Sequence, residues 1–271
     1  MKIVCLDAAT LGGDADLSEI ASLGEFESYE MTEPSQTAQR LAGADIVITN
    51  KVLITDEIMA QTALKLICVS ATGTNNIDMQ AAQARGIAVK NVAGYSTNSV
   101  VQQTFASLFA LTNALGYYAD YGSSGKWCES EIFTHIDAPI SEIYGKEFGA
   151  IGLGQIGAKV ARIAAAFGAN VRYYSTSGAN DNGEFARVSL DALLRTCDII
   201  SIHAPLNQKT AGLIGEAELA KMKEGAILMN FGRGGIVDED ALARAVDERG
   251  LRTALDVLQT EPMRADHPLL R

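Results

Sequence analysis

The sequence contains no block of lysine and arginine residues, and its charge balance is acidic. It has 33 aspartate and glutamate residues against 22 lysine and arginine residues, which gives a formal net charge of −11. Proteins that bind nucleic acid through its phosphate backbone need a basic patch, so the composition excludes that class of function. An anionic ligand must instead be held by backbone amides or by a few well-placed cations.

Segments that lead a chain into or across a membrane are also missing. The chain begins directly with a strand-like run, residues 2–6, and shows no signal peptide. Its most apolar helical stretch, residues 105–118, is interrupted by Thr112, Asn113 and Gly116 and is too short to span a bilayer. We therefore expect a cytoplasmic protein with no membrane partner.

The four cysteines show no C-x-x-C spacing, and no metal site is expected. Cys5, Cys68 and Cys197 lie in or beside apolar runs. We expect them to be reduced, buried thiols, as suits the cytoplasm.

What the chain does contain is the pattern of an α/β protein. With 271 residues, 48% of them hydrophobic, it exceeds a usual single domain and can bury a sizeable core. Short β-branched runs alternate with helical patterns, the rhythm of a parallel sheet with helices on both faces. In the first part of the chain, the predicted strands are residues 2–6, 45–49, 65–69 and 87–90.

This rhythm breaks at residues 94–97, where we place a domain boundary, and a long helix over residues 96–118 is predicted next. The rhythm resumes after an aromatic stretch around Trp127. The second part is predicted to contain strands 148–151, 170–174, 198–202, 226–230 and 252–257, and helices 155–167, 189–196 and 239–248. We therefore expect two doubly wound α/β units.

A glycine-rich pattern, G-x-G-x-x-G, stands between a predicted strand and a predicted helix of the second part. Gly152 allows a tight turn, Gly154 lets a pyrophosphate approach the backbone, and Gly157 lets the helix pack closely on the strand. The first helical residues, Gln155 and Ile156, then present unpaired N–H groups to the phosphates. The pattern in this context predicts dinucleotide binding.

The residue that ends the next strand distinguishes NAD from NADP, because an acid there binds the ribose hydroxyl and repels a 2′-phosphate. That position is Ser175, followed by Thr176 and Ser177. No acid is present, and no arginine or lysine follows directly. The sequence leaves both NAD and NADP open.

Three more motifs follow predicted strands of the second part, where ligands bind in such folds. They are residues 201–206 with Thr210, residues 229–238 (Met-Asn-Phe-Gly-Arg-Gly-Gly-Ile-Val-Asp), and residues 254–262 (Ala-Leu-Asp-Val-Leu-Gln-Thr-Glu-Pro). Together with residues 71–78 and 99–102, they make the chain resemble the D-2-hydroxyacid dehydrogenase family. Within it, the chain is most similar to the glycerate dehydrogenase or hydroxypyruvate reductase branch.

The resemblance covers essentially the whole chain. It implies a flavodoxin-like substrate-binding domain over residues 1–95 and an NAD(P)-binding Rossmann domain over residues 96–271 that begins with a hinge and dimerisation helix. The implied activity is hydride transfer between NAD or NADP and a small D-2-hydroxy or 2-oxo acid such as hydroxypyruvate, glycerate or glyoxylate. The implied assembly is a homodimer.

The same resemblance implies roles for individual residues. Arg233 would bind the substrate carboxylate and the 2-oxo oxygen with its planar fork. Glu261 would hold a histidine that acts as general acid/base and raise its pKa. Backbone donors of Thr72, Gly73 and Thr74 would bind the substrate carboxylate. The cofactor would contact Ser175, Thr176, His203, Ala204, Pro205, Thr210, Phe231, Gly232 and Asp256, the last through the nicotinamide carboxamide.

Each of these roles has a structural alternative. Arg233 could be a surface residue in a turn, Asp256 a helix N-cap, Glu261 a solvated loop acid, and residues 72–74 a mere turn. Two other classes of function also stay open: a dinucleotide-sensing scaffold for transcriptional partners, as in corepressors of this fold, and an inactive dimer partner. Arg233 and Glu261 together favour an enzyme, because a sensor needs neither.

The resemblance places the family's general acid/base histidine one strand after the Glu-Pro pair, which is beyond Arg271. The family's final helix, which returns to the first domain, is expected there too, so the chain resembles a C-terminally truncated member. Within the chain, His267 precedes the expected strand, His203 belongs to a cofactor loop and His135 to the hinge region. We expect cofactor binding to survive and turnover by these residues alone to be poor.

Overall fold

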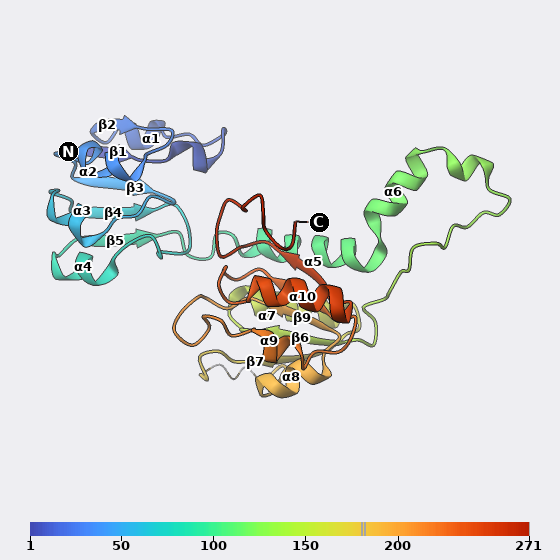
Figure 1. Ribbon diagram of the computed structural model, residues 1–271. Coiled ribbons are helices and arrows are strands. Elements are labelled where there is room, and N and C mark those ends of the chain that lie inside the picture. Colours follow the sequence, from blue (N-terminus) through green and yellow to red (C-terminus); the bar gives the residue numbers. More distant parts are fainter. Residues whose placement is uncertain (180, 182, 271) are drawn as a thin grey trace. The chain divides into compact units, whose positions relative to one another are not determined.

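The computed structural model describes residues 1–271 except 180, 182 and 271. The chain divides into two compact units, Met1–Ser96 and Thr97–Arg271. Each unit has its own parallel sheet (Figure 1). The predicted fold class, two doubly wound α/β units, is confirmed.

The sheet of the first unit has the strand order β2-β1-β3-β4-β5, with every pair parallel, as in flavodoxin-like folds. Its strands are β1 (Lys2–Cys5), β2 (Glu25–Ser28), β3 (Ile46–Thr49), β4 (Leu66–Val69) and β5 (Ala88–Asn91). Four of them match the predicted strands to within one residue at each end. The prediction missed β2, because this edge strand carries two glutamates in place of an apolar run.

Short helical segments connect these strands. They are η1 (Ala8–Leu11), α1 (Ser18–Ala21), η2 (Pro34–Gln36), α2 (Thr37–Arg40), α3 (Asp56–Ala60) and α4 (Met79–Ala84). Side chains alternate between the two faces of a strand. On one face, Val4 and Leu6 of the β1 segment share a buried core with Leu41, Met59 and Ala82, which lie on or beside α2, α3 and α4.

The opposite face of the first sheet is covered only in part. Ile3 and Cys5 pack there with Ile20 of α1, and an apolar groove lies open beside them along β1, β3 and β4. Cys68 lines this groove and is half-buried, so the predicted burial is wrong for Cys68. It is confirmed for Cys5 and Cys197, and burial raises the pKa of the Cys197 thiol to about 11.

The second sheet has the strand order β11-β10-β9-β6-β7-β8, with every pair parallel. Its strands are β6 (Glu147–Ile151), β7 (Asn170–Tyr174), β8 (Ala186–Arg187), β9 (Ile199–Ile202), β10 (Ile227–Asn230) and β11 (Arg252–Leu255). Numbered within the unit, this is the order 3-2-1-4-5-6 of dinucleotide-binding domains. The order reverses between β6 and β9, so their carboxyl ends flank the crevice where such folds bind ligands.

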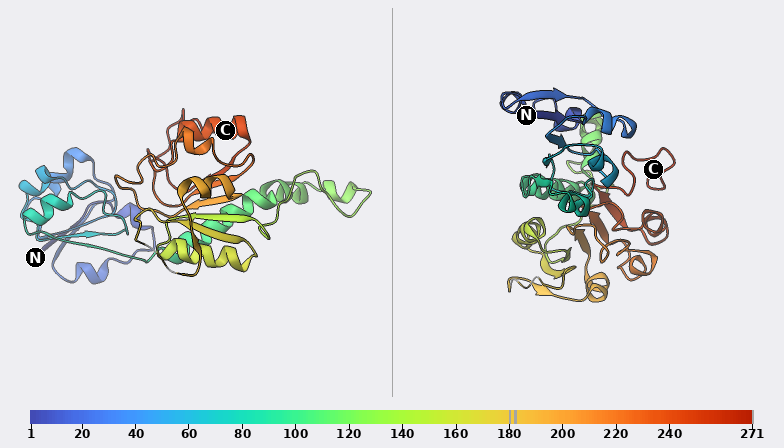
Figure 2. Two further views of the ribbon diagram at one scale, coloured as in Figure 1. Left: turned by 90° about the horizontal axis from the view of Figure 1, so that it is seen from below. Right: turned by 90° about the vertical axis from the view of Figure 1, so that its left-hand side faces the viewer.

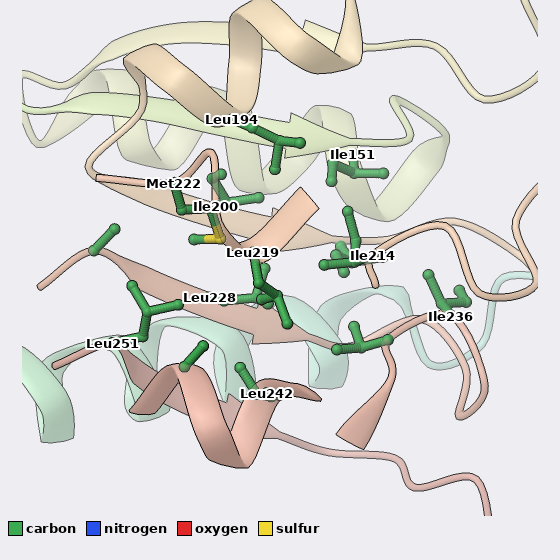
Figure 3. Close-up of a cluster of buried hydrophobic side chains, with 14 of the residues drawn as sticks. Ile151, Leu194, Ile200, Ile214, Leu219, Met222, Leu228, Ile236, Leu242 and Leu251 are labelled. Atoms are coloured by element: carbon green, nitrogen blue, oxygen red, sulfur yellow. The ribbon is translucent and has the colours of Figure 1, made fainter. Parts of the chain in front are cut away.

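Helices cover both faces of the second sheet (Figures 1 and 2). They are α5 (Thr97–Asn113), α7 (Gln155–Ala166), α8 (Leu190–Thr196), α9 (Glu216–Leu219) and α10 (Glu239–Arg249). Phe105 of α5 and Val160 of α7 meet Phe148 on one face. Leu194 of α8 and Leu242 of α10 belong to the core on the other face (Figure 3). Because both faces are buried, the strands read as continuous apolar runs, and all except the two-residue β8 were predicted.

The helix predicted over residues 96–118 is broken in the structure. α5 ends at Asn113, Ala114 adopts a left-handed conformation with φ 49°, and α6 (Leu115–Ser123) follows before the short η3 (Lys126–Glu129). The Thr112 hydroxyl donates to the Leu108 carbonyl at 2.9 Å and lies 3.0 Å from the Asn113 side-chain oxygen. Such local bonds compete with the helix ladder. No helix in the described part of the chain is long and apolar enough to cross a bilayer.

Candidate dinucleotide and substrate site

The glycine turn joins β6 to α7 through a very close backbone approach. Gly152 has φ +90°, a conformation that L side chains rarely adopt. A β-carbon on Gly157 would lie 2.1 Å from the carbonyl oxygen of Gly152. Only glycine at this position lets α7 begin so close to the end of β6, as the sequence pattern predicts.

The N-terminus of α7 faces open space. Gly154 is its N-cap and supplies no side-chain cap, and no protein atom lies within 4 Å of the position where its β-carbon would be. The first backbone N–H groups of a helix have no partner within the helix, and the helix dipole adds positive potential there. The turn therefore offers a place for a phosphate group.

A pocket of about 540 Å³ opens at this turn. It lies at the point where the strand order of the second sheet reverses and has the size of a small-molecule site. Three segments line it: the glycine turn, the residues after β7 and the loop after β9. Its lining residues are Gly152, Leu153, Gly154, Thr176, Ser177, His203, Pro205, Asn207, Gln208 and Lys209.

Thr210 holds the loop after β9 in place through hydrogen bonds of its side chain. It is fully buried, and its hydroxyl donates to the Pro205 carbonyl at 2.7 Å and accepts the N–H of Asn207 at 2.8 Å. The neighbouring Ala204 is buried against Gly232, where a β-carbon would lie 2.5 Å from the Ala204 carbonyl oxygen. Thr210 and Ala204 therefore fix the shape of the pocket wall and do not line the pocket.

His203 presents a neutral imidazole to the pocket. Its Nε2 lies 2.8 Å from the hydroxyl of Ser201, and its ring stacks near that of Phe231 with centroids 6.3 Å apart. Its Nδ1 is buried and has no hydrogen-bond partner in the described part of the chain. Burial lowers the pKa of His203 to about 3. A histidine with so low a pKa cannot act as a general acid near neutral pH.

Arg233 is held by a buried asparagine that the sequence reasoning did not single out. Asn230, the last residue of β10, accepts the N–H of Gly232 at 3.0 Å and donates to the Arg233 carbonyl at 2.9 Å. Gly234 brings this turn against the segment after β11, because a β-carbon there would lie 1.9 Å from the Leu258 carbonyl oxygen. The motif contains Asn230, but only the tertiary structure shows that it clamps the turn.

The Arg233 guanidinium bonds only within its own turn, donating to the Gly232 carbonyl at 2.8 Å. It is half-buried and pairs with no carboxylate among the residues that the structure describes. A partly buried, unpaired guanidinium has unsatisfied donors in a fixed fork. This arrangement suits a ligand carboxylate and argues against a mere surface role.

The two acids of the third motif lie near each other after β11. Burial first, and then the Glu261 carboxylate, raise the pKa of Asp256. Asp256 caps no helix, since none follows it in the described chain. Glu261 accepts the N–H of Leu258 at 3.0 Å and is exposed.

None of the three histidines pairs with Glu261. His267 is buried; its Nε2 lies 2.8 Å from the Glu239 carboxylate at the start of α10, and its Nδ1 accepts the N–H of Leu269. Both ring nitrogens are thus engaged, Nε2 with α10 and Nδ1 with the backbone of its own segment. His135 stacks on Tyr121 with ring centroids 3.6 Å apart. The structure therefore gives His267 a structural role.

In the first unit, the predicted substrate residues follow β4. The Thr72 hydroxyl donates to the Val92 carbonyl at 3.1 Å, and the Asn91 amide donates to the Thr72 carbonyl at 2.6 Å, so the loop is tied to the end of β5. The backbone N–H groups of Gly73 and Thr74 have no protein partner in the described chain. They are available to an anion.

Asp7 lies at the end of β1, beside the point where the strand order of the first sheet reverses between β1 and β3. Ligands of such sheets bind at this point. The buried Asp7 carboxylate accepts the N–H groups of Asn50 and Lys51 at 3.0 and 2.6 Å. The protein's own carboxylate therefore occupies the donors that a ligand anion would use there. The loop after β4, in contrast, keeps the Gly73 and Thr74 N–H groups without a protein partner in the described chain.

The fold and pocket are those of a dinucleotide-binding domain, and comparison with known proteins gives the family. The catalytic-domain profile of the D-isomer specific 2-hydroxyacid dehydrogenases matches residues 10–183, and their NAD-binding-domain profile matches residues 105–271. The chain belongs to this family, as the sequence motifs predict. It is a nicotinamide-dependent oxidoreductase of the 2-hydroxy acid type.

Relatives cover the whole chain. A putative 2-hydroxyacid dehydrogenase of Haemophilus influenzae is 39% identical, with 100% of this chain and 86% of the relative covered. A hydroxypyruvate reductase of Blautia hydrogenotrophica is 36% identical with the same coverage. A glycerate dehydrogenase of Methylorubrum extorquens is 38% identical over 96% of this chain and 82% of the relative.

Solved structures agree with this assignment. A Thermus thermophilus protein aligns with a TM-score of 0.86 and 29% identity over 99% of this chain and 85% of its own. An acyclic imino acid reductase in complex with NADPH and D-Arg aligns with a TM-score of 0.83 and 31% identity at the same coverage. A Staphylococcus aureus formate dehydrogenase in complex with NAD aligns with a TM-score of 0.78 and 27% identity, over 99% and 85%.

The half-buried His203, whose Nδ1 is fully buried, predicts a pH-dependent loss of stability. Because its pKa in the folded state is about 3, the unfolded chain takes up a proton below about pH 6.5 that the folded chain refuses. Stability should therefore fall as the pH drops from about 6.5 toward 3, by up to ~1.4 kcal/mol per pH unit from this group. Urea unfolding of wild type and His203→Gln between pH 7 and 4 should show the weaker pH dependence in the variant. Parallel curves would contradict this assignment.

Proposed function

We propose that the enzyme interconverts hydroxypyruvate or glyoxylate and the corresponding 2-hydroxy acid, with its nicotinamide cofactor in the pocket at the ends of β6 and β9. The observation that carries the proposal is the unpaired guanidinium of Arg233, held by Asn230 on the strand next to β9. The relatives named as hydroxypyruvate reductase and glycerate dehydrogenase support a substrate of this size.

The residues of the second unit fit a dinucleotide. The close approach of Gly157 to Gly152 and the open space at Gly154 form a cradle that side chains would fill. The backbone of Gln155 and Ile156 would bind the pyrophosphate, and Thr176 the adenosine ribose. The rest of the cofactor would lie along Ser175, Pro205, Phe231, Gly232 and Asp256. Ala204 and Thr210 would shape the pocket wall. When bound, the cofactor supplies or accepts the hydride.

The substrate residues then act on the carboxylate and the oxygen of the 2-oxo acid. Arg233 would bind both with its fork, which stabilises negative charge on the oxygen as the hydride reaches C2. In the first unit, which we propose as the substrate-binding domain, the N–H groups of Gly73 and Thr74, beside Thr72, are the proposed carboxylate donors. A general acid gives the proton to the oxygen. Glu261 would orient that group, for which the family resemblance implies a histidine.

We further propose a homodimer in the cytoplasm. The stretch after α5 exposes large apolar side chains, with Ile132, Phe133 and Ile136 exposed by 62, 86 and 80%. Apolar groups gathered in this way mark interaction surfaces, and a two-fold dimer is the commonest arrangement that covers them. Sedimentation velocity at micromolar concentration should show a dimer, and Phe133→Asp should shift it toward the monomer. A wild type that sediments only as a monomer would overturn this part.

Substrate binding by Arg233 is tested with Arg233→Lys, which keeps the charge and removes the fork. We expect kcat/KM for hydroxypyruvate and glyoxylate to fall by at least about a hundredfold, roughly 2.7 kcal/mol. The Kd for the dinucleotide should change little, because Arg233 does not line that pocket.

The matched control is Arg244→Lys, since Arg244 is an exposed arginine of α10 that pairs with Glu216. Its activity should equal that of wild type. If Arg233→Lys loses less than a few-fold in kcat/KM, Arg233 has no part in substrate binding.

A further inference from the structure

The adenosine end of the proposed cofactor pocket carries hydroxyl groups and no acid. Ser175, Thr176 and Ser177 follow β7, and the hydroxyls of Ser175 and Ser177 lie 3.5 Å apart. Thr176 and Ser177 line the pocket. A carboxylate at this position would bind the ribose 2′-hydroxyl and repel a 2′-phosphate. Hydroxyls carry no charge that would repel a 2′-phosphate, and they can donate to phosphate oxygens.

The structure brings a distant lysine to these hydroxyls. Lys209 comes from the loop after β9 and lines the same pocket as Thr176 and Ser177. Its backbone N–H donates to the side-chain oxygen of Asn207 at 2.9 Å, so the loop is locally fixed. Among the described residues, no carboxylate pairs with the Lys209 ammonium group. The sequence shows no cation directly after Ser175, and only the fold supplies one.

A second cation lies on the other side of the same turn. Arg187 belongs to β8, which pairs with β7 and places Arg187 opposite Tyr173. Its guanidinium lies beside Gly178, 3.8 Å from the position where a β-carbon of that glycine would be. Arg187 also forms no ion pair within the described chain.

Of the carboxylates of Glu184 and Asp181, that of Glu184 is paired with a cation. Glu184 accepts two hydrogen bonds from the Arg162 Nε at 2.9 and 3.0 Å and a third from Nη2 at 2.8 Å. Asp181 accepts the N–H of Gly183 at 3.4 Å. Lys209 therefore lines the pocket, and Arg187 lies beside Gly178, without an ion-pair partner among the described residues, in a chain whose net charge is −11. A local positive charge in an acidic protein favours the binding of an anionic ligand group.

We propose that this end of the pocket binds the 2′-phosphate of NADP(H), with Lys209 as its main partner and Arg187 as the second, and that the enzyme prefers NADP(H) to NAD(H). The inference rests on the proposed function, since it requires the dinucleotide to lie in this pocket. Charge-assisted hydrogen bonds from Lys209 and the hydroxyls of Thr176 and Ser177 give the phosphate its affinity. The 2′-hydroxyl of NAD(H) gains nothing comparable.

The test is the Kd of NADPH and NADH for the whole chain, measured by nicotinamide fluorescence. Wild type should bind NADPH at least about tenfold more tightly than NADH. Lys209→Met, which keeps an apolar stem, should weaken NADPH at least about tenfold and NADH less than about twofold. Arg187→Met should act in the same direction with a smaller effect. Lys126→Met removes an exposed lysine of η3, outside the pocket, and should change neither Kd.

A second variant adds the missing acid. Thr176→Asp should weaken NADPH binding and leave NADH binding nearly unchanged, which reverses the preference. Wild-type binding of NADH as tight as that of NADPH would overturn the inference and leave the proposed function standing. An equal loss of both dinucleotides in Lys209→Met would also overturn it, because Lys209 would then act on the loop. Failure of wild type to bind either dinucleotide would overturn the proposed function itself.

Discussion

The close approach of Gly157 to the carbonyl oxygen of Gly152 is the constraint on which the second unit depends. Any side chain at Gly157 would collide with that oxygen. α7 can therefore begin at the end of β6, with its unpaired N–H groups at the reversal of strand order. The loop after β9 leaves the sheet at the same edge, which places Lys209 in the pocket with Thr176. The pocket therefore depends on the close contact between the backbones of Gly152 and Gly157, which a β-carbon at Gly157 would prevent.

Buried polar residues then hold the loops that carry the chemistry. Asn230 bonds both ends of the turn that presents Arg233. Thr210 closes the loop after β9, and Asp7 occupies the backbone donors at the end of β3. Each of these residues hydrogen-bonds backbone groups of its loop, and a typical bond of this kind contributes about 0.5–1.5 kcal/mol. A site that positions a small acid requires such fixed loops on a packed sheet.

Most of the fold could be predicted from sequence because strands buried on both faces read as apolar runs. The edge strand Glu25–Ser28 and the left-handed Ala114 could not, since neither leaves a periodic apolar signal. The glycine turn is a local motif and was predicted with its role. Asn230 bonds Gly232 and Arg233 within its own turn, and a side-chain bond of this kind cannot be read from the motif alone. Lys209 lines the pocket with Thr176, which is distant in sequence, and no spacing rule reveals that contact.

The central claim is that a nicotinamide dinucleotide lies on the N-terminus of α7, and Gly154→Val tests it most directly. A β-carbon at Gly154 would lie more than 4 Å from every atom beyond the neighbouring residues, so the fold should persist. We predict that NADPH and NADH fluorescence titrations both show at least about a hundredfold weaker binding, with an unchanged circular dichroism spectrum. A folded variant that binds either dinucleotide as tightly as wild type would contradict the account.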